Sequence, residues 1–192
     1  MSNIMAWDEL TLLKQEAVST FNRRGNLKPE DIERFCDYME FVLCLIYDYG
    51  WKDAEQIVGI VPFKDGLDDK AVLKEIAGEN FRQRVEKVLG PVTDTEPVPE
   101  DLLRIVDTEA HRDYNTGVVD AGIQSGEPKL MKRWNTMMDN RVRDPHSYLE
   151  GVKVGLEDRF YTYTGESTLF PGGFGVPDLD INCRCWVTLE RG

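Results

Sequence analysis

The spacing of apolar residues changes near residue 151, and this change is the strongest constraint on the fold. Before it, apolar side chains recur every three or four residues, as they do along one face of a helix. After Gly151 come short runs in which β-branched and aromatic residues alternate with polar ones, a pattern that favours strands. We therefore expect an α+β fold, with a helical N-terminal region followed by helices packed with a small C-terminal β-sheet.

Start and stop signals place the individual elements. A first helix contains the apolar residues from Trp7 to Phe21 and should end near Gly25. A second should begin at Pro29, because proline suits the first turn of a helix, and Gly50 is a plausible stop. Further helices are predicted at 52–58, 68–89, 99–122 and 130–138, and strands at 152–154, 159–163 and 185–189.

Residues 91–99 interrupt the helical pattern. They contain three prolines together with acids and threonines, and they offer neither an apolar face nor a continuous set of backbone donors. We place a domain boundary here, which gives a helical region at 1–90, a linker at 91–99 and a second domain at 100–192. A loop within one compact domain would have the same composition.

Composition narrows the classes of protein. The 192 residues can bury one core or two closely packed ones. Acidic residues outnumber basic ones by 35 to 23, so the net charge is −12, and such a surface disfavours general coating of nucleic acid. No apolar stretch is long enough to cross a bilayer, and no secretion signal opens the chain, so we expect a protein of the cytoplasm with no membrane partner and reduced thiols.

Two blocks of unusual residues occur in the second half of the chain. One is Thr108-Glu109-Ala110-His111-Arg112-Asp113-Tyr114-Asn115. The other runs from Lys132-Arg133-Trp134-Asn135-Thr136, through Asp139-Asn140-Arg141-Val142-Arg143 and His146, to Asn182-Cys183-Arg184-Cys185. In this order they resemble the phage Mu F-like minor head protein family, also called the phage head morphogenesis family.

The resemblance implies a minor structural protein of a tailed bacteriophage, present in few copies in the phage head and in the host cytoplasm during assembly. The implied partners are the portal protein, with the major capsid or scaffolding protein as a further candidate, and, incidentally, packaged DNA. The N-terminal half carries no motif of the family, and we separately expect its helices to supply the docking contacts. One departure is clear. Where the family pattern has a Pro-Gly-Asp-Pro-like turn, this chain has Pro171-Gly172-Gly173-Phe174-Gly175, without the aspartate.

The pair Cys183 and Cys185 suggests a metal site. In an extended segment both thiols lie on one face and Arg184 on the other, so both sulfurs could face His146. Sulfur and imidazole ligands suit a structural zinc ion. Two alternatives stay open, since the cysteines could be small core residues, or they could form a disulfide near the limit of permitted separation. The candidate metal ligands are His146, Cys183 and Cys185, with Asp180, Asp144 or His111 as a fourth.

Arg141 and Arg143 flank Val142, so an extended backbone would place both guanidinium groups on one side. We expect them to clamp a carboxylate, Glu109 or Asp139, because arginine suits planar bidentate partners. The alternative is a local basic patch that touches DNA or an acidic portal surface, formed with Lys129, Lys132 and Arg133.

Glu109, Arg112 and Asn115 recur at helical spacing, which predicts one polar helix face that could, with His111, bind a polar substrate. However, the chain has two histidines, and it lacks a glycine-rich phosphate loop, a His-Glu-x-x-His motif and a nucleophile elbow. We therefore predict no catalytic residues, no organic cofactor and no enzyme activity. The alternative is a metal-dependent or toxin-related enzyme that acts on nucleic acid or a nucleotide.

Overall fold

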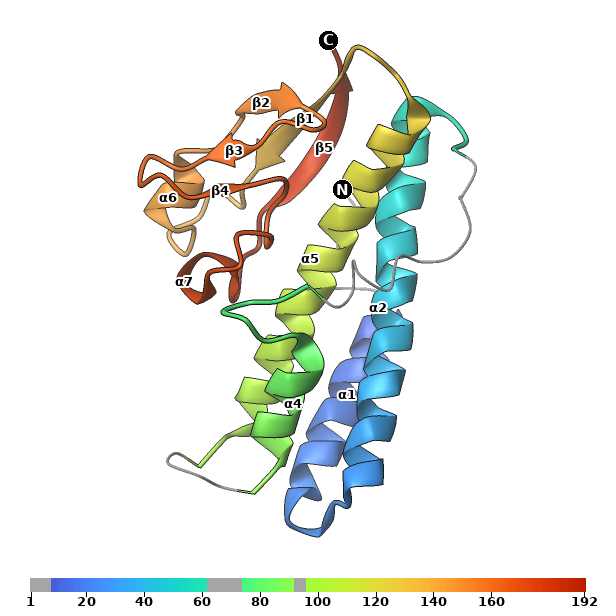
Figure 1. Cartoon of the computed structure of the whole chain (residues 1–192), viewed down its shortest axis with the longest axis vertical. Helices are drawn as coiled ribbons and strands as arrows, with labels where there is room; N and C mark the ends of the chain where they lie inside the picture. Colours follow the sequence, from blue (N-terminus) through green and yellow to red (C-terminus); the bar gives the residue numbers. More distant parts are fainter. Residues whose placement is uncertain (1–7, 62–73, 92–95) are drawn as a thin grey trace.

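A bundle of helices carries a small sheet against one side in the computed structural model, which describes residues 8–61, 74–91 and 96–192 (Figure 1). The long helix α5 (Pro99–Ser125) lies between the sheet on one side and the helices α1 (Asp8–Asn22) and α2 (Pro29–Val58) on the other. This arrangement confirms the predicted α+β fold. The helices are α1 (Asp8–Asn22), η2 (Arg24–Asn26), α2 (Pro29–Val58), α4 (Phe81–Leu89), α5 (Pro99–Ser125), α6 (Asp144–Ser147) and α7 (Pro177–Asp180).

The sheet has β1 (Leu130–Asn135) as its central strand, with β2 (Lys153–Gly155) and β5 (Trp186–Arg191) antiparallel on either side. A second pair joins β3 (Phe160–Tyr161) to β4 (Ser167–Thr168), and β4 was not among the predicted strands. The predicted helix at 130–138 is therefore wrong. Alternate residues of β1, namely Leu130, Lys132 and Trp134, are buried, as in a strand. The backbone of β1 is hydrogen-bonded to β2 along one edge and to β5 along the other.

Helices α2 and α5 cross at two glycines. A Cβ added at Gly50 would lie 2.1 Å from the carbonyl oxygen of Tyr114, and one added at Gly117 would lie 2.1 Å from that of Tyr47. Each glycine therefore allows the backbone of one helix to contact the other. The prediction that a helix stops at Gly50 is wrong for this reason, and residues 52–58 are the last turns of α2.

Helix α4 is shorter than the predicted helix at 68–89. Asn80 caps it, since the Asn80 side chain accepts a hydrogen bond from the Gln83 backbone N–H at 3.1 Å and the Gln83 side chain accepts one from the Asn80 N–H at 3.0 Å. Ala77 and Gly78 before it have φ of +53° and +79°, which no helix tolerates, so the prediction is wrong over 74–80. Residues 68–73 lie outside the described ranges.

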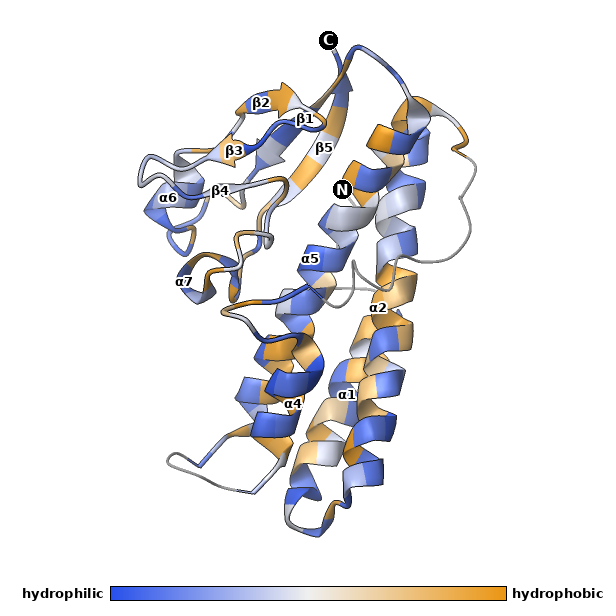
Figure 2. Ribbon diagram, viewed as in Figure 1, coloured by the Kyte–Doolittle hydropathy of each residue, from blue (hydrophilic) through white to orange (hydrophobic). Residues whose placement is uncertain are grey.

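One buried apolar cluster continues through the whole of this architecture. It includes Leu13 of α1, Met39 of α2, Val85 of α4, Leu102 of α5 and Val187 of β5. Figure 2 shows polar and apolar residues sharing each long helix, as expected where one face packs on a core. The division at 91–99 stays a prediction, and across it α1 and α2 pack on α5. None of the described helices is long and apolar enough to span a membrane.

Candidate functional site

The polar face of α5 is buried rather than open to solvent. Glu109, Arg112, Asp113 and Asn115 have exposed fractions of 0, 1, 0 and 0%. Charged and amide groups in an interior require partners, because removal from water without compensation destabilises the fold by several kcal/mol. The partners of these four residues therefore show what this face does.

The first part of the face is an ionic network. Glu109 forms ion pairs with Arg84 of α4 and with Arg112 of its own helix. Arg112 also donates a hydrogen bond of 2.8 Å to the backbone carbonyl of Lys74. The network thus fastens both α4 and the segment before it to α5.

Asp113 lies beside this network without joining it closely. Its nearest arginine nitrogen, Nε of Arg112, is 3.9 Å from its Oδ1. Burial raises the pKa of Asp113 well above its usual range, although the charge of Arg112 acts in the opposite direction.

Asn115 forms the second part of the face. Its Oδ1 accepts a hydrogen bond of 2.9 Å from the backbone N–H of Val187, and its Nδ2 lies 3.3 Å from the carbonyl oxygen of Cys185 and 3.4 Å from that of Pro171. The same nitrogen donates to the carbonyl of His111 at 2.9 Å. One side chain therefore holds the start of β5 and the loop at 171–175 against α5.

The loop that lacks the expected aspartate is organised by a different one. Asp180 in α7 accepts hydrogen bonds from the backbone N–H groups of Phe174, Gly175 and Val176 at 3.0, 2.6 and 3.2 Å. Burial raises the pKa of Asp180, and these three donors partly offset that rise. Asp180 thus fixes the shape of the turn.

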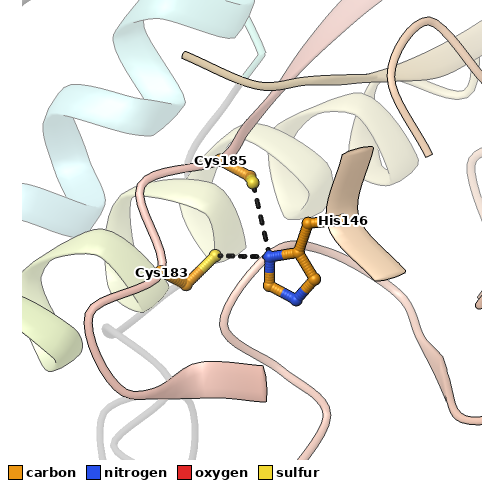
Figure 3. Close-up of side chains that lie close together, drawn as sticks. All are labelled: His146, Cys183 and Cys185. Carbon is orange, nitrogen blue, oxygen red and sulfur yellow. Dashed lines mark hydrogen bonds between the residues drawn. The ribbon is translucent and has the colours of Figure 1, made fainter. Parts of the chain in front are cut away.

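His146, Cys183 and Cys185 come together in a second buried cluster (Figure 3). Nδ1 of His146 lies 3.6 Å from Sγ of Cys183 and 3.5 Å from Sγ of Cys185. The three residues are 1, 4 and 2% exposed. The imidazole ring stacks on Phe174 and meets the edge of Trp134, with centroids 5.7 and 5.5 Å away. Both sulfurs face the histidine, as the alternation of an extended segment requires.

The two thiols have unequal acidities. The neighbouring Cys185 thiol holds the pKa of Cys183 well below its ordinary value, with a smaller contribution from His146. The same neighbour, together with burial, raises the pKa of Cys185. The two thiols therefore titrate as a coupled pair. No disulfide joins any of the four cysteines.

The three residues proposed as a fourth ligand lie elsewhere. The oxygens of Asp180 are occupied by the backbone of the 174–176 turn, and Asp144 is exposed at the start of α6. His111 bonds the backbone of Arg184, and burial lowers its pKa. Among the His, Cys, Asp and Glu residues of the described ranges, His146, Cys183 and Cys185 are the three whose possible metal-ligating atoms lie within 4.8 Å of one another.

The expected roles of Arg141 and Arg143 need correction. Arg143 bonds the backbone carbonyl of Ile181, and Asp139 is clamped by Arg184 at 2.8 and 2.6 Å instead. The backbone turns at 139–142 instead of running extended, and Arg141 donates its backbone N–H to Asp139 at 3.0 Å. The arginines that brace Glu109 are Arg84 and Arg112, and for Arg84 the sequence offered no signal beyond a charge on an amphipathic helix.

Lys132 cannot belong to a surface basic patch. It is fully buried, and its ammonium group donates a hydrogen bond of 2.5 Å to the carbonyl of Leu156 and lies 5.5 Å from the ring centre of Phe160. Burial lowers its pKa to about 8. Arg133 is also engaged, in ion pairs with Glu150 and Glu190.

Comparison with known proteins gives this geometry a context. Residues 69–188 match the family described as Phage Mu protein F like protein. The chain belongs to this family. The Mu F-like region contains α4, α5, the buried polar face, the His146 cluster and nearly all of the sheet, whereas α1 and α2 precede it.

Two curated proteins are similar in sequence to part of this Mu F-like chain. The NAD(+)–arginine ADP-ribosyltransferase EFV of Enterococcus faecalis is 33% identical over 100 residues, which are 50% of this chain and 20% of that protein. The Minor head protein GP7 of Bacillus phage SPP1 is 29% identical over 79 residues, 41% of this chain and 26% of that protein. The matched part is thus about a quarter or less of either relative. No solved structure shows a significant match.

Proposed function

We propose that this chain is a minor structural protein of a bacteriophage head that takes part in head morphogenesis. Membership of the Mu F-like family and similarity to a minor head protein support this function. The proposed location is the virion head, after assembly in the host cytoplasm.

The observation that carries the proposal is that the polar residues of α5 are buried and bonded to other segments of the same chain. A catalytic group must reach its substrate. Glu109, Arg112 and Asn115 are instead at most 1% exposed and hold other segments of the chain in place. Polar residues that form internal contacts of this kind favour a structural protein over an enzyme.

An enzyme is the second candidate, because one relative is named as an ADP-ribosyltransferase. That name applies to the relative, and the shared segment makes up 20% of it. Purified protein incubated with NAD⁺ and an arginine-containing acceptor tests the candidate. We expect no consumption of NAD⁺ and no modified arginine.

We further propose that the surface of α1 and α2 docks on the portal, with the major capsid or scaffolding protein as other candidates for the partner. A groove of about 570 Å³ lies between these helices and is lined by apolar and charged residues, among them Leu12, Arg23, Phe35 and Tyr38. Leu12 is 55% exposed at this groove. A groove that mixes apolar and charged side chains suits a protein partner better than DNA, which the net charge of −12 also repels.

Quantitative mass spectrometry of purified particles tests the head assignment, with this chain counted against the portal and major capsid proteins. We expect a low and reproducible copy number. Complete absence from particles would overturn the assignment and favour a transient assembly factor or an enzyme that acts elsewhere.

A charge placed in the groove tests the docking surface. Leu12→Lys should lower incorporation into particles without unfolding the protein, because the side chain is mainly solvated. Gln56→Lys, at an exposed position of α2 away from the groove, is the control and should be incorporated normally. Equal incorporation of the two variants would place the docking surface elsewhere.

A further inference from the structure

The nitrogen-to-sulfur distances in the His146 cluster match those across a tetrahedral metal ion. Zinc binds sulfur at about 2.3 Å and imidazole nitrogen at about 2.0–2.1 Å, so the tetrahedral angle separates nitrogen from sulfur by about 3.5–3.6 Å. Nδ1 of His146 lies 3.6 and 3.5 Å from the sulfurs of Cys183 and Cys185. We propose that these three residues bind one zinc ion that joins α6 to the segment leading into β5.

The chemistry of the donors selects the metal. Thiolate and imidazole suit zinc, whereas magnesium and calcium require oxygen ligands. On binding, each of the two thiols loses its proton to solvent, and the sulfur forms a bond to the metal. Two thiolates and one Zn²⁺ then give a site of zero net charge, which a buried location tolerates far better than an isolated ion.

The surroundings hold the ligands in place. Phe174 stacks on the imidazole and Trp134 closes its edge, so the ring presents Nδ1 to the sulfurs. Phe174 is in turn fixed by its backbone hydrogen bond to Asp180. The described part of the chain supplies three ligands to the proposed ion. The fourth tetrahedral position would then be filled by a small ligand such as water.

The proposed ion would close a long loop. His146 and Cys183 are 37 positions apart, and the chain between them contains β2, β3, β4 and α7. A cross-link of this kind stabilises the folded chain by restricting the unfolded one. This role is independent of the proposed function in the phage head.

Metal analysis of the full chain, purified from zinc-containing medium without chelators, tests the proposal. We expect one zinc per wild-type chain and a large loss in Cys183→Ser and in Cys185→Ser. Cys44→Ser is the matched control, since this cysteine lies in α2, outside the cluster. The Cys44→Ser protein should keep its zinc. A wild-type chain that holds no zinc, and takes none up after addition of Zn²⁺, would overturn the proposal.

Cobalt substitution gives a reading that does not depend on the folding of any variant. Wild-type protein loaded with Co²⁺ should show the intense visible bands of a tetrahedral site and a sulfur-to-cobalt charge-transfer band in the near ultraviolet. Weak octahedral bands without charge transfer would mean that the sulfurs do not bind the metal, and the proposal would fail.

Discussion

Replacement of Gly50 by alanine should destabilise the protein, although the same change stabilises most helices. The added Cβ would lie 2.1 Å from the carbonyl oxygen of Tyr114, and its nearest neighbours are all backbone atoms of α5. A side chain could rotate away, but a backbone carbonyl within a helix cannot. Helices α2 and α5 must therefore move apart by about 1 Å to restore a normal contact distance.

Two opposing effects set the magnitude. Alanine is favoured over glycine in a helix interior by about 1 kcal/mol. Forcing extra volume into a packed interface typically costs about 1–3 kcal/mol, and more where the backbone must shift. Because the contact here involves two rigid helix backbones, we take the cost at about 3–5 kcal/mol, above the typical range. After the gain of about 1 kcal/mol from helix propensity, the free energy of unfolding should fall by about 2–4 kcal/mol, which lowers Tm by roughly 4–16 °C.

Thermal and urea unfolding of Gly50→Ala, beside two reference variants, test this reasoning. Gly25→Ala is the matched control, since a Cβ there would have nothing within 4 Å, and its stability should stay within about 0.5 kcal/mol of wild type. The double variant with Gly117→Ala should lose less than the sum of the single losses, because one displacement relieves both contacts. Equal stability of Gly50→Ala and Gly25→Ala would refute the close crossing.

Two further predictions concern the buried polar groups. Asn115→Ala leaves the N–H of Val187 and the carbonyl of Cys185 without this partner, so the free energy of unfolding should fall by about 2–4 kcal/mol in urea titrations; a loss below about 0.5 kcal/mol would contradict the role of the amide. Burial lowers the pKa of Lys132 from 10.5 to about 8, so the unfolded chain binds more protons between these values and stability should rise with pH across that window. This contribution is complete above pH 10.5 and is lost as the pH falls through about 8. Lys132→Met should remove the slope, and a flat wild-type profile would show that the ammonium group is well solvated.

The sequence predicts the fold where the information is local. Spacing and start signals place α1, the start of α2 and both ends of α5 within a few residues of their observed bounds. Gly50 is misread because a glycine at a helix crossing has the same local pattern as a glycine that ends a helix, and only the partner helix distinguishes them. Leu130 and Trp134 are misread because a spacing of four fits a helix face and also two positions on one face of a strand.

The same distinction applies to the candidate site: features that depend on local sequence were predictable, and features that depend on packing were not. The alternation of Cys183 and Cys185 predicts their common direction, because it depends on two neighbouring residues. The link from Arg84 to Glu109 could not be predicted, since it depends on how α4 packs on α5. The clamp of Arg184 on Asp139 depends likewise on a turn at 139–142 that has no strong sequence signal.

The bond between Asn115 and Val187 also has a consequence for synthesis on the ribosome. The two residues are 72 positions apart, so α5 is made well before the strand that covers its polar face. At typical translation rates the interval is roughly 4–14 s. During this interval the polar face of α5 is exposed to solvent. A polar face aggregates less readily than an apolar one, so the incomplete chain should be less prone to aggregation before β5 is synthesised.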